Sequence, residues 1–234
     1  MKIIIRGFVN TMTKPQKIAG LIYLPFHMFI IPLFLGMAAI WLPGGLDEVT
    51  ATVIYYAVGF LFCLVFMWKY LRNAFDIMLD NKAASIAAII FGYVSCLLLS
   101  YLAAGVLFAI LGDQLSNPNN DAILDLASES PRAVLGLAVF LAPVVEEVLF
   151  RGVIFGSLRV KHRAAAFIVS IGLFALYHIW QLALASMDWT MLVYMLQYIP
   201  AGYALAWAYE KTDSIWIPIF LHMLINGVAM LILS

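Results

Sequence analysis

The 234-residue sequence has too few charged residues for a water-soluble domain. Charged side chains make up 11% of the chain and hydrophobic side chains 65%. In soluble domains roughly 25% of the residues are charged and about 45 to 50% are hydrophobic. Because so little polar surface cannot cover a globule in water, the sequence predicts an integral membrane protein whose main surroundings are the lipid bilayer.

Net charge and cysteine are also scarce. The 13 basic and 13 acidic residues cancel, which excludes nucleic-acid binding driven by a strong overall charge. The only two cysteines, Cys63 and Cys96, lie inside apolar runs. A small buried hydrophobic residue is more common there than a disulfide. We therefore expect neither a nucleic-acid partner nor a disulfide framework.

Long apolar runs dominate the chain. A helix needs about 20 residues to cross the bilayer core, and seven runs of about that length lie between polar breaks. The third run is long enough to hold a break near Gly105, which would add an eighth, shorter or re-entrant element. The predicted fold is all-α, a polytopic membrane bundle of seven to eight transmembrane helices. The seven runs are residues 18–41, 51–68, 83–111, 133–158, 164–186, 189–209 and 214–234.

The placement of lysine and arginine predicts the orientation, because cytoplasmic segments are enriched in both. With the N-terminus inside, eleven basic residues fall in inner segments and only Arg132 in an outer one, while Arg151 lies within a span. This split predicts a cytoplasmic N-terminus and an external C-terminus. We divide the chain into N-terminal transmembrane helices at 1–112, an outer polar loop at 113–132 and a C-terminal core at 133–234.

The fourth run carries three ionisable residues at bilayer depth: Glu146, Glu147 and Arg151. Such side chains cost at least a few kcal/mol each and usually face the bundle interior or a cavity. Glu147 and Arg151 are four residues apart on one helical face, so they are expected to pair. Glu146 points about 100° away and lacks this partner. We interpret Glu146 as the chemically active residue of the three.

Two later runs bring polar side chains to a similar depth. His178 lies in the fifth run, and His222 and Asn226 lie one turn apart in the seventh. Taken singly, these residues also suit interhelical hydrogen bonding. At 1.5 Å per residue, however, Glu146, His178 and Asn226 all lie about 20 to 22 Å from the inner boundary, and His222 roughly 14 Å. The agreement favours one shared site.

The chemistry of this set is that of a hydrolase. A carboxylate in a low-dielectric cavity suits a general base that takes a proton from water. His178 can hold the same water, while His222 and Asn226 can donate hydrogen bonds to an oxyanion. An alternative is a divalent metal such as zinc, because Glu146, His178 and His222 are the ligand types of several zinc hydrolases.

The three patterns together resemble the motif series of one family. Glu146-Glu147-x-x-x-Arg151, Phe174-x-x-x-His178 and His222-x-x-x-Asn226 are similar to the motifs of the CPBP family, the CAAX proteases and bacteriocin-processing enzymes, also called the Abi family. The resemblance covers roughly residues 131–230. Each pattern is weak alone, but their order in separate apolar runs is specific.

The resemblance implies an intramembrane endopeptidase of the plasma membrane that acts on membrane-associated proteins or peptides. It implies that Glu146 is the catalytic base, that His178 positions the water and that His222 and Asn226 stabilise the oxyanion. Glu147 and Arg151 would support the site. Members have been described both as metalloproteases and as metal-independent enzymes, so the family does not decide the cofactor. By the same resemblance, the cavity would open on the cytosolic side.

Two other functions fit the intramembrane residues. An ion-coupled carrier would use the glutamates and histidines to relay charge, and a non-catalytic immunity or regulatory protein would keep the site as a binding pocket. A carrier often shows related halves, which this sequence lacks. A binding protein would tolerate the substitution of Glu146 by Gln, whereas a peptidase would not.

Overall fold

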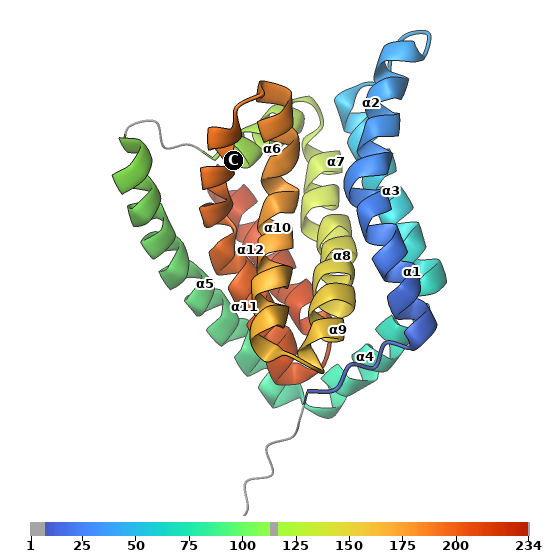
Figure 1. The fold of residues 1–234 in the computed structure, drawn as a ribbon, viewed down its shortest axis with the longest axis vertical. Helices are drawn as coiled ribbons and strands as arrows, with labels where there is room; N and C mark the ends of the chain where they lie inside the picture. The colour runs from blue at the N-terminus through green and yellow to red at the C-terminus, as the bar shows by residue number, and fades with distance from the viewer. Residues whose placement is uncertain (1–7, 113–116, 234) are drawn as a thin grey trace, which may run out of the picture.

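The computed structural model describes residues 8–112 and 117–233, and in these ranges it contains helices and no strands. The chain runs up and down between two ends of one bundle (Figure 1). The helical elements of the N-terminal half are α1 (Lys14–Pro25), η1 (Phe26–Ile30), α2 (Ile31–Trp41), α3 (Glu48–Phe66), α4 (Trp68–Asp80) and α5 (Lys82–Leu111).

The C-terminal half contains the more irregular helices. Its elements are α6 (Pro118–Glu129), α7 (Pro131–Gly136), η3 (Leu137–Leu141), α8 (Ala142–Glu147), η4 (Val148–Phe155), α9 (Gly156–Arg159), α10 (Arg163–Ser186), η5 (Trp189–Gln197), α11 (Ile199–Thr212) and α12 (Trp216–Leu233). In this half η3 and η4 are π-helical and η5 is a 3-10 helix.

Five helices of the described chain are long and apolar enough to cross a bilayer. They coincide closely with the first five predicted runs, which supports a multi-pass helical bundle. The helix in the place of the seventh run, α12, is shorter, with 18 residues. The five are 14–41, 48–66, 82–111, 131–159 and 163–186.

The sixth predicted run, 189–209, is not one continuous helix. It forms the nine-residue 3-10 helix η5, and α11 begins only at Ile199. Pro200 is the second residue of α11, and a proline removes a backbone donor and disfavours helix in the residue before it. Irregular backbone at membrane depth is tolerated where it lines a protein cavity, and Gln197 and Tyr198 do so here.

Two other segments have local structure that the sequence did not specify. Helix α5 runs without a break through Gly105, because one glycine costs a helix about 1 kcal/mol, less than unpaired backbone groups cost in lipid. Within the predicted polar loop, Pro118–Glu129 forms α6. Asn117 caps this helix by accepting a hydrogen bond from the backbone N–H of Asn120, and Pro118 occupies its first position.

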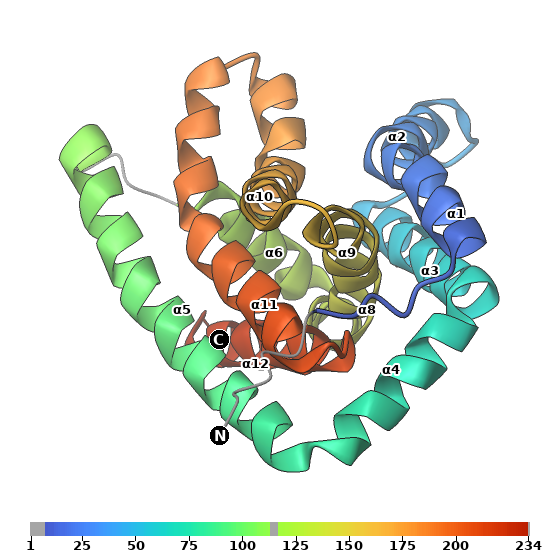
Figure 2. The ribbon, with the colours of Figure 1, turned by 60° about the horizontal axis from the view of Figure 1, so that its bottom comes forward.

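Helix α4 was not predicted and lies across one end of the bundle, joining α3 to α5 (Figure 2). It is amphipathic: Tyr70, Leu71 and Ala74 are buried, whereas Lys69 and Arg72 are exposed. A helix of this kind suits the boundary between membrane and water. Trp216 ties α12 to α4 at this end, because its indole N–H donates to the carbonyl of Leu71 at 2.8 Å.

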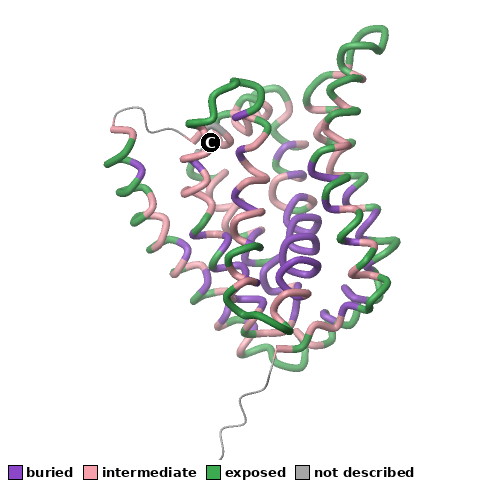
Figure 3. Tube along the Cα trace, viewed as in Figure 1, coloured by how far each residue is buried: buried purple, intermediate pink, exposed green. Residues whose placement is uncertain are grey.

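The fourth membrane helix, 131–159, lies at the centre of the bundle. In its most apolar stretch of 18 residues, 61% of the residues are buried, compared with 11% in α5. The purple, buried residues of Figure 3 are accordingly concentrated on α8 and η4. Helix α5 instead exposes large apolar side chains such as Leu98 and Leu102. The ionisable residues of the fourth run are therefore enclosed by other helices rather than by lipid.

Candidate active site

Glu146 and Glu147 are the last two residues of α8, a six-residue α-helix between two π-helical segments. The preceding segment is η3 and the following one is η4. π-helical turns inside α-helices are rare and often mark functional sites. Both glutamates are buried, at 3% and 0% exposure. The irregular winding therefore presents two carboxylates to the interior at the centre of the bundle.

The Glu146 carboxylate meets both predicted histidines. Its Oε2 lies 3.8 Å from Nε2 of His178 and 4.0 Å from Nε2 of His222. Its Oε1 accepts a hydrogen bond from the hydroxyl of Tyr56 at 3.2 Å. Oε2 itself has no hydrogen-bond partner among the residues that the structure describes. Thus three spans, α8, α10 and α12, bring their polar groups together around one free carboxylate oxygen.

Both imidazoles are oriented by their other nitrogen. Nδ1 of His178 is 2.8 Å from the carbonyl oxygen of Phe174, which can only accept, so this Nδ1 carries the proton. Nδ1 of His222 is 2.9 Å from Oε1 of Glu147 and donates to that carboxylate. Such bonds fix the tautomer and the direction of a histidine ring. In both rings Nε2 is left facing Glu146.

Glu147 and Arg151 form the ion pair that their spacing predicts. Nη1 of Arg151 is 2.9 Å from Oε1 of Glu147, and both side chains are 0% exposed. Nη2 of Arg151 donates to the carbonyl of Gly202 at 3.2 Å, and its guanidinium lies 4.2 Å from the centre of the Phe174 ring. Oε1 of Glu147 thus receives hydrogen bonds from Arg151 and His222. The pair neutralises a buried charge and holds His222.

Asn226 lines the same cavity but has a structural contact of its own. Its Nδ2 donates to the carbonyl oxygen of Ala138 at 2.8 Å. In η3 the backbone bonds run to the fifth residue back, as from Ala142 to Leu137. The next donor would be residue 143, a proline without an N–H. Asn226 therefore takes the carbonyl that Pro143 leaves free, and its second N–H remains available.

Tyr56 is a site residue that the sequence did not indicate. It lies on α3, in the half of the chain without motifs, and contacts Glu146 directly. Its neighbour Tyr55 donates instead to the hydroxyl of Tyr177 at 3.0 Å. A tyrosine inside an apolar run carries no periodic or motif signal, and interhelical packing explains it equally well. Only the three-dimensional contact identifies its partner.

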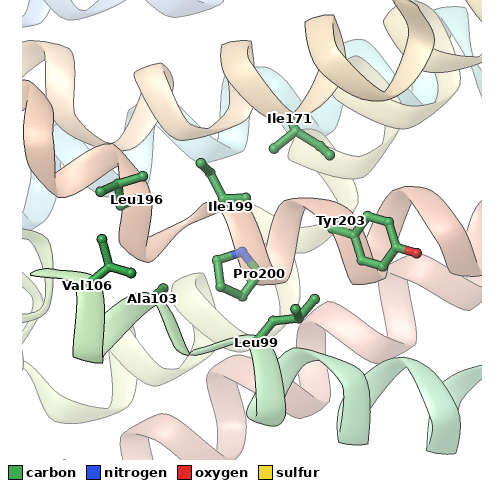
Figure 4. A pocket seen from close by; sticks show the side chains of 8 residues that line it. All are labelled: Leu99, Ala103, Val106, Ile171, Leu196, Ile199, Pro200 and Tyr203. Atoms are coloured by element: carbon green, nitrogen blue, oxygen red, sulfur yellow. The ribbon is translucent and has the colours of Figure 1, made fainter. Parts of the chain in front are cut away.

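These residues face a cavity of about 640 Å³. Its walls come from α2, α3, α5, α6, α7, α8, α10, α11 and α12, and from η3 and η5. A second cavity, of about 430 Å³, lies where the junction of η5 and α11 faces α5 and α10 (Figure 4). Apart from Tyr203, the side chains that line the second cavity are apolar: Leu99, Ala103, Val106, Ile171, Leu196, Ile199 and Pro200. Only the larger cavity combines space with reactive groups.

The donor atoms around Glu146 have the chemistry of a zinc site but not its spacing. Zinc bound at about 2.0 to 2.1 Å in a tetrahedral site holds its ligand atoms roughly 3.4 Å apart. The separations here are 3.8 and 4.0 Å. No group of three or more His, Cys, Asp or Glu in residues 8–112 and 117–233 is arranged to hold a metal. The predicted metal set of Glu146, His178 and His222 stays a prediction.

The comparisons with known proteins bear on the same part of the chain. Residues 128–228 match the family model described as type II CAAX prenyl endopeptidase Rce1-like. This range contains Glu146, Glu147, Arg151 and both histidines of the site. No solved structure matches the chain significantly.

Three bacterial proteins are similar in sequence. YdiL of Bacillus subtilis (strain 168), provisionally named a membrane peptidase, is 27% identical over 74% of the chain and 68% of its own length. The membrane-embedded CAAX protease MroQ of Staphylococcus aureus (strain USA300) is 30% identical over 58% of the chain and 53% of its own length. The protein YxdF of Lactococcus lactis subsp. lactis (strain IL1403) is 32% identical over 40% of the chain and 44% of its own length. For the latter two, the chain spans about half of the relative's length.

Proposed function

The chain belongs to the CPBP family of membrane CAAX proteases, and from this premise we propose that it is an intramembrane endopeptidase in which Glu146 activates water. The observation that carries the proposal is the convergence on Oε2 of Glu146. This unpartnered carboxylate oxygen faces two imidazole nitrogens at 3.8 and 4.0 Å beside a cavity. A general base needs this combination of a free acceptor and room for water and substrate.

The spacing suits a water molecule. A water that makes two hydrogen bonds of about 2.8 Å at an angle of roughly 90° holds its two partner atoms about 4 Å apart. A water oxygen at that position contacts Glu146, His178 and His222 together. All three contact atoms are acceptors when both rings are neutral, but water has only two protons. A contact with all three atoms therefore needs one more proton, which the proposed mechanism places on Nε2 of His222.

The proposed reaction follows from these positions. Glu146 takes a proton from the water, and the hydroxide oxygen forms a bond with the carbonyl carbon of the substrate peptide. The carbonyl oxygen becomes an oxyanion, to which protonated His222 and the second N–H of Asn226 donate hydrogen bonds. The C–N bond then breaks as Glu146 returns the proton to the leaving amine. The products are a carboxylic acid and an amine, and the acid gives its remaining proton to the amine, so that they leave as a carboxylate and an ammonium group. No covalent acyl enzyme forms.

The supporting residues have defined tasks in this scheme. Glu147 fixes the direction of the His222 ring through its 2.9 Å contact with Nδ1. Arg151 pairs with Glu147, so its positive charge offsets part of the repulsion between the two carboxylates. A divalent metal, if one binds, would be held by Glu146, His178 and His222 and would polarise the carbonyl. The spacing favours water, so no step requires the metal.

We propose membrane-associated proteins or peptides as substrates and the plasma membrane as the location. The test compares membrane and secreted peptides, by mass spectrometry, from cells with equal folded amounts of the wild type or Glu146→Gln. Glu129→Gln, which removes an exposed carboxylate on α6, is the matched control. Fragments common to wild type and control but missing with Glu146→Gln would support the proposal. Identical patterns in all three would contradict it and favour a carrier or a non-catalytic binding protein.

A further inference from the structure

The cavity reaches only one of the two ends of the bundle. From Glu146, its lining extends along η3 to α6 and along α12 to Met230 near the C-terminal end of that helix. On α3 it includes Glu48, the first residue of the helix. Helix α6, the start of α3 and the end of α12 lie together at the upper end in Figure 1. The cavity therefore opens at this end, called here the α6 end.

The opposite end is closed below Glu146. The residues that follow it in the central helix fill the interior: Leu149, Arg151, Val153 and Phe155 are each 0% exposed. None of the residues from 147 to 159 lines the cavity. The hydroxyls of Tyr70 and Tyr209 are joined by a 2.9 Å hydrogen bond in this packed region. Substrate therefore has no open route to Glu146 from this end, called here the α4 end.

The closed end is also the basic end of the protein. Helix α4, the start of α1, the start of α5, the turn between α9 and α10 and the end of α11 all lie there (Figures 1 and 2). At the α6 end, Arg132 stands among the acidic residues Asp121, Asp125 and Glu129. Cytoplasmic segments of membrane proteins are enriched in lysine and arginine. The basic residues of the α4 end are Lys14, Lys17, Lys69, Arg72, Lys82, Arg159, Lys161, Arg163 and Lys211.

From these two asymmetries we infer that the cavity opens on the outer, non-cytoplasmic face of the membrane. The substrate then reaches Glu146 from outside the cell or from the outer leaflet. This direction is the opposite of the one that the family resemblance suggests. The side from which the cavity is reached does not depend on catalysis. The substrate class inferred from it rests on the proposed peptidase function.

The lining of the cavity restricts the chemistry of that substrate. The asparagines at its mouth, Asn117, Asn119 and Asn120, offer amide hydrogen bonds to a peptide backbone. Leu126, Leu182 and Met230 add apolar wall. No lysine or arginine of the described ranges, 8–112 and 117–233, lines the cavity, so a free C-terminal carboxylate would lack an ion-pair partner of that kind. The substrate class is therefore a translocated peptide, or the outward-facing segment of a membrane protein, cleaved at an internal bond.

The test measures access without requiring activity. Cys63 and Cys96 are replaced by alanine, and single cysteines are introduced by Met230→Cys in the cavity and by Lys161→Cys in the turn at the α4 end. Right-side-out and inverted membrane vesicles are treated with a membrane-impermeant maleimide, and labelling is measured by mass shift. Ala229→Cys and Val160→Cys form a second pair if either first variant fails to accumulate.

We expect Met230→Cys to react at least tenfold faster in right-side-out vesicles, and Lys161→Cys to react at least tenfold faster in inverted ones. The reverse pattern would overturn the inference, as would labelling of both cysteines from one side. In a second arm, Glu146-dependent cleavage sites should map to outward-facing segments. If labelling follows expectation but no Glu146-dependent cleavage exists, the proposed function fails and the direction of the cavity stands.

Discussion

The hydroxyl of Tyr56 donates a hydrogen bond to Oε1 of Glu146 at 3.2 Å, and this contact joins the N-terminal half of the bundle to the candidate base. With Oε1 occupied, the other oxygen, Oε2, faces the histidines. Tyr56 is therefore a positioning residue. It comes from α3, outside the residues that match the family model.

Removing this hydroxyl should slow turnover without weakening substrate binding. For Tyr56→Phe we expect kcat to fall about tenfold or more, the worth of a hydrogen bond to a charged group. KM should stay within twofold, because Tyr56 orients the carboxylate. The adjacent Tyr55→Phe is the matched control, since its hydroxyl bonds Tyr177 instead. Equal losses of kcat in both variants, or a rise in KM with kcat unchanged, would show that Tyr56 does not position Glu146.

Arg151 should matter more for folding than any other residue of the site. It is fully buried and pairs with the fully buried Glu147. Breaking such a pair costs about 3 to 5 kcal/mol, because one charge is left uncompensated. We expect Arg151→Ala to lower the melting temperature in detergent strongly and the double variant Glu147→Gln/Arg151→Met to recover part of it. Arg132→Ala, at an exposed position, should leave the melting temperature unchanged. A stable Arg151→Ala protein would contradict this assignment.

Glu210 gives the protein a pH-dependent contact at the α4 end. Its carboxylate bonds Arg163 at 2.7 and 2.8 Å and also Arg159. Burial alone would raise the pKa of Glu210, but hydrogen bonds from Arg163 and Arg159 outweigh it and lower the pKa. A carboxyl with a lowered pKa in the folded state stabilises the fold above its ordinary pKa, and this contribution disappears as the pH falls through the folded value.

The consequence is measurable with Glu210→Gln. At pH 7 this variant should be less stable than the wild type by roughly 1 kcal/mol, since the ion pair is partly exposed. The difference in melting temperature should shrink as the pH falls below the ordinary glutamate range of about 4. Melting curves in detergent between pH 7 and pH 3.5 measure it. A difference that grows towards acid pH would show that the sign of the pKa shift is wrong.

Metal removal separates the two hydrolytic mechanisms. Since the spacing around Oε2 of Glu146 suits water better than tetrahedral zinc, we expect activity to survive exhaustive dialysis against a chelator within about twofold. The same preparations should contain much less than one metal per chain by elemental analysis. Activity that disappears with the metal and returns with one equivalent of zinc would instead make Glu146, His178 and His222 ligands.

The sequence predicted that several polar side chains from different spans lie close together. Charged residues in an apolar run are costly, so their positions are informative, and the regular rise of a helix relates Glu146, His178 and His222 in depth. The structure places Nε2 of each histidine within about 4 Å of the Glu146 carboxylate. The pairing of Glu147 with Arg151 followed from their spacing in the same way. Asn226 was expected near an oxyanion, and its contact with Ala138 adds a packing role.

Other features depend on tertiary contacts that a single sequence does not encode locally. The break before α11 lies next to Pro200, and the π-helical winding of η4 has no residue signature in the chain. Tyr56 resembles any tyrosine in an apolar helix until its partner is known. The direction of the cavity depends on which interior positions the neighbouring helices fill. These properties could not be predicted from runs, charges or spacings.

The most direct measurement uses the protein purified in lipid nanodiscs with a peptide that contains a cleavage site found in cells. The rate of hydrolysis is compared between the wild type, Glu146→Gln and Glu129→Gln, with melting temperatures measured on the same samples. The account predicts that Glu146→Gln lowers the rate by about 10² to 10⁴-fold, the range for loss of a general base, while its fold and the control rate stay intact. A folded Glu146→Gln protein that cleaves the peptide within tenfold of the wild-type rate would contradict it.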